Sequence, residues 1–62
     1  MTPSEIKRLR TRRGQSQEEF ARDVGVSVFS VVRWETGKNR PAQLARRRLL
    51  QIAQQGKAVA AR

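Results

Sequence analysis

The chain has 62 residues, which allows one domain, because a chain of this length buries only about 60% of the surface that its unfolded form exposes. It contains no cysteine and no histidine, which excludes disulfides, thiolate zinc sites and the commonest general base. We therefore expect no metal, no cofactor and no enzymatic activity. Fourteen lysines and arginines against five acidic residues give a formal charge of +9, which favours a polyanionic partner.

The distribution of apolar residues narrows the class further. No apolar run approaches the roughly 18 residues needed to cross a membrane, and there is no signal-peptide core. We therefore expect a cytoplasmic protein without a membrane partner. Hydrophobic residues make up 37% of the chain and recur at helical spacing, which argues against a disordered basic tail.

The first two helices are predicted by the same start signal. Thr2 can act as an N-cap with Pro3 at the first helical position and Glu5 closing a capping box, which predicts a helix over 3–13 that Gly14 ends. Ser16 and Glu19 repeat the box and predict a helix over 17–24, ended by Gly25.

A third helix is predicted over 28–35, with Ser27 as its N-cap and its end before Gly37. The valines of this stretch would also suit a strand, but the surrounding Gly and Ser residues favour a helix. Pro41 begins a fourth helix, predicted over 41–54 and ended by Gly56. We expect a single domain over 1–56 and a flexible C-terminal tail over 57–62.

Apolar residues lie on one face of each predicted helix and form one small core, which is their expected role in preference to a cofactor site. The expected core residues are Ile6, Leu9, Phe20, Ala21, Val24, Val26, Val31, Trp34, Ala45, Leu49 and Ile52.

The segment 17–41 carries the functional signal. Ala21 is small enough for two helices to cross closely, Gly25 can adopt positive φ in the turn, and Val31 faces inward, as in a helix-turn-helix. The outer face of the second of these helices then presents side chains to a DNA major groove. These side chains are Val28, Phe29, Val32 and Arg33.

The pattern Q-x-x-x-A-x-x-x-G-V from Gln17, followed by W-E-x-G from Trp34, resembles the lambda-repressor-like (Cro/XRE) family of DNA-binding domains. The stretch V-S-V-F-S-V-V-R-W-E-T-G-K-N-R-P further resembles small antitoxin-type regulators such as HigA-like and MqsA-like proteins. The resemblance implies an all-α, compact four-helix fold. From the length of 62 residues, we expect neither the sensor domain nor the long fifth helix that larger relatives carry.

The resemblance also implies roles for individual residues. Those in the base-reading positions are Ser27, Val28, Phe29, Val32 and Arg33. Those expected at DNA phosphates are Gln17, Lys38, Asn39 and Arg40, and those with structural roles are Arg10, Ala21, Gly25, Val31, Trp34 and Glu35. Arg10 and Glu35 match a pair that ties the first helix to the end of the third. Phe29 departs from the family, whose members often carry a polar residue there.

Alternatives remain open at several of these positions. Gln17 could be a solvated first-turn residue, and Phe29 could lie in the core, contact thymine methyl groups or face a protein partner. Lys38 and Arg40 could belong to a solvated loop, and Arg33 could reach a guanine or a phosphate. The run 46–48 spreads over about 200° of a helix, so these arginines cannot all face one duplex.

We therefore expect a sequence-specific regulator of transcription, a repressor, that binds double-stranded DNA and is associated with the nucleoid. A homodimer is expected, with Leu50 and Val59 as interface candidates. The main alternative is an antitoxin that chiefly binds a toxin partner. RNA binding is disfavoured because no aromatic stacking platform is evident.

Overall fold

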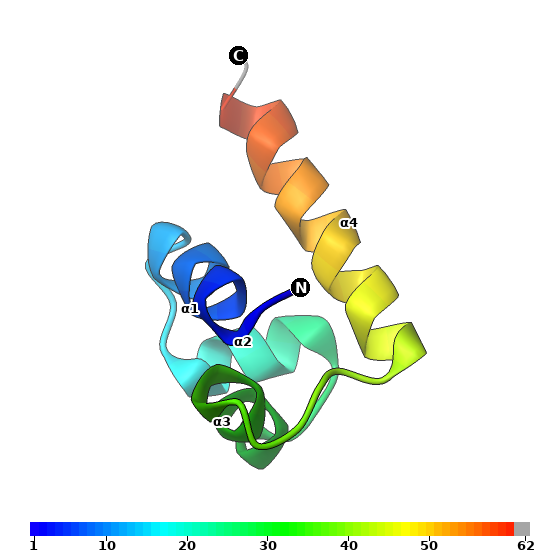
Figure 1. Ribbon diagram of the computed structural model, residues 1–62. Coiled ribbons are helices and arrows are strands. Elements are labelled where there is room, and N and C mark those ends of the chain that lie inside the picture. The colour runs from blue at the N-terminus through cyan, green and yellow to red at the C-terminus, as the bar shows by residue number, and fades with distance from the viewer. Residues whose placement is uncertain (61–62) are drawn as a thin grey trace.

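The computed structural model describes residues 1–60, with side chains up to residue 55. The described part is all-α, without strands, and contains α1 (Pro3–Arg12), α2 (Gln17–Val24), α3 (Val28–Thr36) and α4 (Gln43–Ala60) (Figure 1). The expected four-helix class is confirmed. It follows from apolar stripes at helical spacing separated by glycines.

The predicted boundaries of the first three helices agree with the structure to within one residue. The fourth prediction is wrong at both ends. Pro41 and Ala42 precede α4, and the carbonyl of Ala42 accepts the hydrogen bond from the amide of Arg46 at 2.8 Å. The helix also continues through Gly56 to Ala60, because a single glycine lowers helix propensity by only about 1 kcal/mol. The flexibility expected of 57–62 stays a prediction, and the side chain of Val59 and residues 61–62 lie outside the described part.

Both predicted capping boxes are present. The hydroxyl of Thr2 accepts a hydrogen bond from the amide of Glu5 at 3.2 Å, and the Glu5 carboxylate accepts one from the amide of Thr2 at 2.7 Å. Ser16 and Glu19 form the same reciprocal pair at 3.1 and 2.8 Å. The hydrogen bond from the backbone of each N-cap residue lowers the pKa of the carboxyl of Glu5 and of Glu19.

One core joins the four helices. Its buried members are Ile6, Phe20, Ala21, Val24, Val31, Trp34, Leu49 and Ile52, and Met1, Leu9, Val26, Val28 and Ala45 pack against them in part. Every expected core residue is thus in or against the core. Val28 joins them, although the sequence placed it on the outer face.

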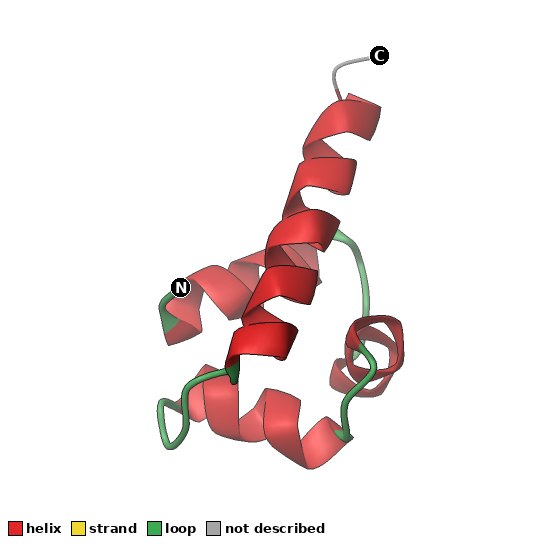
Figure 2. Cartoon of the chain, turned by 90° about the vertical axis from the view of Figure 1, so that its right-hand side faces the viewer, coloured by secondary structure: helices red, strands yellow, loops and turns green. Residues whose placement is uncertain are grey.

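The first three helices form a packed body, and α4 runs along it and projects beyond it in both views (Figures 1 and 2). Helix α2 packs against both α3 and α4, and α1 packs against α3. The guanidinium of Arg48 donates a hydrogen bond to the carbonyl of Asp23 at 3.2 Å, which ties α4 to the last turn of α2.

Candidate nucleic-acid interface

The turn between α2 and α3 sets the start of α3. Gly25 has φ of 86°, a left-handed conformation that a side chain would strain, and its amide donates to the carbonyl of Ala21 at 2.8 Å. The amide of Val26 donates to the same carbonyl at 3.0 Å. Ser27 then caps α3 by accepting a hydrogen bond from the amide of Ser30 at 3.3 Å. The chain thus changes direction within three residues.

The inner face of α3 is fixed by burial. Val31 is fully buried and Trp34 is 5% exposed, so the helix cannot rotate about its axis without exposing them. Val28 and Val32 are half-buried and lie at the boundary between inner and outer faces. Only parts of these two side chains are accessible to a partner.

The outer face of α3 carries three exposed members of the predicted base-reading set, Ser27, Phe29 and Arg33. Phe29 is 69% exposed, which excludes the core position that the sequence left open. The two ion pairs of the described residues involve Arg10 and Arg13, so Arg33 has no acidic partner there. An apolar ring and a cation therefore face solvent from the same helix.

A partly buried polar network holds the C-terminal half of α3 to α1 and α2. The guanidinium of Arg10 donates two hydrogen bonds to the carboxylate of Glu35, at 2.6 and 3.1 Å, and a third to the carbonyl of Gln15 at 3.0 Å. The side-chain amide of Gln17 donates a hydrogen bond to the same carboxylate at 3.2 Å. The side chains of Arg10 and Glu35 are 14% and 5% exposed, and the hydrogen bond to Glu35 raises the pKa of Arg10. Three helices therefore meet at one carboxylate.

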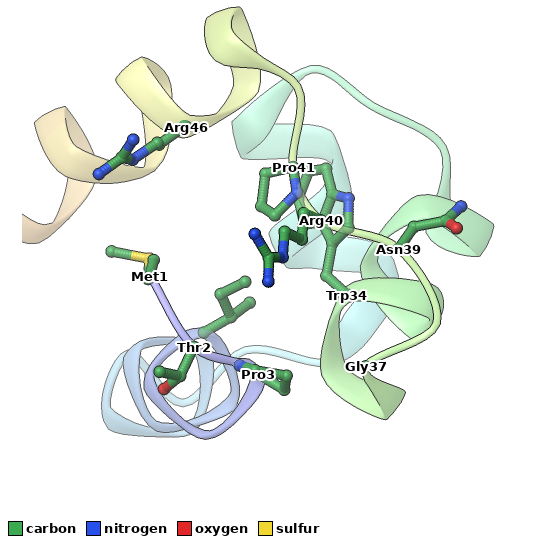
Figure 3. Close-up of a pocket in the computed structure, with 10 residues that line it drawn as sticks. Met1, Thr2, Pro3, Trp34, Gly37, Asn39, Arg40, Pro41 and Arg46 are labelled. Carbon is green, nitrogen blue, oxygen red and sulfur yellow. The ribbon is translucent and has the colours of Figure 1, made fainter.

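The loop after α3 is held by the helix that it leaves. Gly37 is left-handed, with φ of 79°, and the amides of Lys38 and Asn39 both donate to the carbonyl of Arg33, at 2.9 and 3.4 Å. Lys38, Asn39 and Arg40 are exposed. Asn39 points outward, whereas the guanidinium of Arg40 turns back into a cleft beside the start of α1 (Figure 3). In the loop, Asn39 therefore points outward, Arg40 points inward, and Lys38 is exposed to solvent.

A family model described as a helix-turn-helix domain matches residues 4–62, nearly the whole chain. The chain belongs to the helix-turn-helix domain family. A search of the curated proteins and a search of the solved structures each gave no match. The match and the geometry of α2, the turn and α3 together identify a DNA-binding helix-turn-helix domain.

Some features of this domain were not expected from its sequence. Leu44, at the start of α4, is 78% exposed. The sequence pattern does not predict this exposure, because Leu44 does not interrupt the apolar face of the helix. Asp23 accepts hydrogen bonds from Arg13 at 3.3 Å and Gln15 at 2.6 Å, which lowers the pKa of the Asp23 carboxyl. These contacts join the turn after α1 to the end of α2.

The described residues of the domain contain no group of three acidic residues that could hold a metal ion. Among these residues, no helix is both long and apolar enough to cross a membrane.

Proposed function

We propose that the helix-turn-helix domain is a sequence-specific transcriptional regulator of the lambda-repressor-like (Cro/XRE) type, and that it represses by inserting α3 into the major groove of its operator. The observation that carries the proposal is the outer face of α3, where Phe29 is 69% exposed while Val31 is fully buried on the inner face. A helix anchored on one side and solvated on the other can enter a groove without losing its core.

The exposed residues of α3 suit direct readout. The ring of Phe29 can pack on thymine methyl groups, which distinguish thymine from cytosine in the major groove. Arg33 can bond the acceptors of a guanine, and the hydroxyl of Ser27 at the start of α3 can bond a base edge or a phosphate. Val28 and Val32, which are half-buried, extend the apolar surface on one side of Phe29. This arrangement favours a site that contains T·A pairs.

The phosphate contacts come from the two flanks of α3. The backbone amides of Lys38 and Asn39 hold the loop to the carbonyl of Arg33 at the end of α3. Lys38 and Asn39 would grip the DNA backbone from there, and Arg40 would join them by swinging its exposed side chain out of the cleft beside α1. The side-chain amide of Gln17 donates one of its two hydrogens to Glu35. Its second hydrogen can be donated to a phosphate at the positive N-terminal end of α2. Gln17 would then brace α3 and position the duplex at once.

Homodimerisation follows from the energetics of a module of this size. A single small module buries about 600–1,000 Å² on DNA, which limits its affinity, and a two-fold dimer doubles the contacts on a two-fold site. Leu50, 46% exposed on α4, is the described candidate for the interface. The exposed Phe29 and Leu50 would also suit a toxin partner, so an antitoxin is the second candidate function.

The proposal is tested by selecting duplexes from a random library with the purified protein and titrating the selected site at several salt concentrations. A dimer that neutralises about 6–10 phosphates should lose roughly 10³–10⁵ in affinity between 50 and 200 mM salt. A selection that enriches no sequence, or an affinity that does not respond to salt, would contradict the proposal. Co-purification of a stoichiometric protein partner whose binding depends on Phe29 would favour the antitoxin instead.

A further inference from the structure

A cleft of about 580 Å³ lies between the N-terminal end of α1, the loop after α3 and the first turn of α4. Its size falls in the range of about 300–1,000 Å³ that is typical of small-molecule sites. It is formed by segments from three parts of the chain that the core holds in place, so the walls exist without a ligand (Figure 3).

Part of the lining of the cleft is apolar and the rest is polar. Ile6 and Trp34 contribute from the buried core, and Pro3 and Pro41 close two sides with rigid rings. A chain of carbon atoms or an aromatic ring would bury its surface against these walls at the expense of water.

The charged side chains that line the cleft are both cationic. The guanidinium of Arg40 extends between the loop and α1, whereas Arg46 lines the cleft from α4 with its guanidinium directed away from Arg40 (Figure 3). None of the lining residues, all within the described part of the chain, is acidic. Neither arginine belongs to the two ion pairs found among the described residues. The cleft therefore carries positive charge without an acidic side chain to balance it, which favours an anion.

We propose that this cleft is a binding site for a small organic carboxylate with an apolar body. Arg40, whose guanidinium lies in the cleft, binds the carboxylate through its fork of donors, and Arg46 adds positive charge at the edge of the cleft. The apolar body lies against Trp34, Ile6 and the two prolines. An inorganic anion would balance the positive charge but leave the apolar part of the lining in contact with water. A neutral apolar molecule would cover the apolar part but leave the positive charge without a counter-charge.

The side chain of Trp34 gives the site its own reporter. The chain contains one tryptophan, so the intrinsic fluorescence at long excitation wavelength comes from the wall of the cleft. Phenylacetate and octanoate supply an aromatic and an aliphatic body on the same anionic group. Phenylacetamide and octanamide keep each body and remove the charge.

The test titrates the full chain, without DNA, with each of the four compounds while the emission of Trp34 is followed. Both carboxylates should give saturable changes with millimolar or tighter dissociation constants, as ligands of about ten non-hydrogen atoms allow. The amides should bind at least about tenfold more weakly, because they leave the arginines without a counter-charge. Absence of saturation with both carboxylates, or equal affinity for acids and amides, would overturn the proposal.

Matched variants locate the site. Arg40→Gln should weaken phenylacetate binding by about tenfold, the size of one charge-assisted contact, and Arg46→Gln should weaken it by less, because the guanidinium of Arg46 points away from that of Arg40. Arg47→Gln makes the same charge change one residue along α4, at an exposed position that does not line the cleft, and should leave binding unchanged. Equal losses in all three variants would reduce the effect to net charge and overturn the site. Since no DNA is present, the result is independent of whether the domain regulates transcription.

Discussion

Helices α2 and α3 both begin with a serine N-cap, yet their first turns differ in charge. Helix α2 has Glu18 and Glu19 there, and Glu19 closes a capping box on Ser16. Helix α3 has no acidic residue in its first turn, and Ser30 occupies the position at which Glu19 stands in α2. Acidic residues at a helix start stabilise the helix through its dipole by about 0.3–1 kcal/mol, so α3 forgoes a local stabilisation that α2 has.

The difference fits a division of labour within the helix-turn-helix. A carboxylate at the start of α3 would lie beside the proposed base-reading residue Ser27 and repel the duplex, whereas at the start of α2 the proposed phosphate contact is made by Gln17 alone. Besides its N-cap, α3 is held by the burial of Val31 and Trp34 and by the network at Glu35. Helix α2 thus has one local stabilisation that α3 lacks.

The largest effect is expected from breaking the tertiary support of α3. Glu35→Ala leaves Arg10, 14% exposed, without its carboxylate. Because the pair is partly buried, the loss should lie between the roughly 1 kcal/mol of an exposed pair and the roughly 3–5 kcal/mol of a fully buried one. Urea unfolding followed by circular dichroism measures the loss. Asp23→Asn is the matched control, because the ion pair between Arg13 and Asp23 is 28% and 42% exposed and should contribute less than about 1 kcal/mol.

A double variant separates the stranded charge from the lost contact. Arg10→Met with Glu35→Met removes both charges and keeps apolar volume, so it should be more stable than Glu35→Ala alone. Equal stability of Glu35→Ala and the unmodified domain would show that the network does not support α3.

The next largest effect is expected when α3 is given the charged first turn of α2. Ser30→Glu would give α3 the capping box of α2, which should raise the melting temperature and weaken DNA binding by about ten- to a hundredfold through repulsion of phosphates. Ser30→Gln can close the same box without charge and should spare DNA binding. If both variants bind DNA equally well, the charge difference between α2 and α3 has no bearing on recognition.

A smaller effect concerns the loop that follows α3. Lys38→Ala should weaken binding to the selected site and to a scrambled duplex alike, and lower the slope of log affinity against log salt by about one. Arg12→Ala, an exposed cation on α1 without an assigned contact, serves as the control. A loss confined to the selected site would assign Lys38 to base readout.

The smallest effect on stability is expected from lowering the pH. The pKa values of Glu5, Glu19 and Asp23 are lowered in the folded state, so the folded chain holds fewer protons than the unfolded chain at acid pH. Their contribution is complete above the unfolded values near pH 4 and is lost as the pH falls through the lower folded values. Glu19→Gln should therefore flatten the decline of stability below about pH 4. An unchanged acid profile in Glu19→Gln would contradict the contribution of the box.

Local signals in the sequence account for most of the fold. The N-caps Thr2, Ser16 and Ser27 and the glycines at 25 and 37 fix the ends of helices through backbone hydrogen bonds between near neighbours, which the sequence displays directly. The failure at α4 has the opposite cause. No capping residue beside Gly56 ends the helix, and the low helix propensity of one glycine is too weak to outweigh the continued backbone hydrogen bonds of α4.

The candidate interface was less predictable from sequence. The resemblance to a family paired Arg10 with Glu35, but the hydrogen bond from Gln17 to the same carboxylate depends on the packing of three helices. The half-burial of Val28 and the inward turn of Arg40 likewise depend on distant segments. Periodicity gives the face of a helix, and neighbouring elements decide how much of each boundary residue stays exposed.

The central claim is that the outer face of α3 reads bases while the loop grips phosphates. Titration of Phe29→Ala against the selected site and a scrambled duplex, beside the unmodified domain, tests it most directly. The account predicts a loss of about 1–3 kcal/mol on the selected site, a smaller loss on the scrambled one and unchanged stability, because Phe29 is 69% exposed. An unchanged ratio of the two affinities would contradict it.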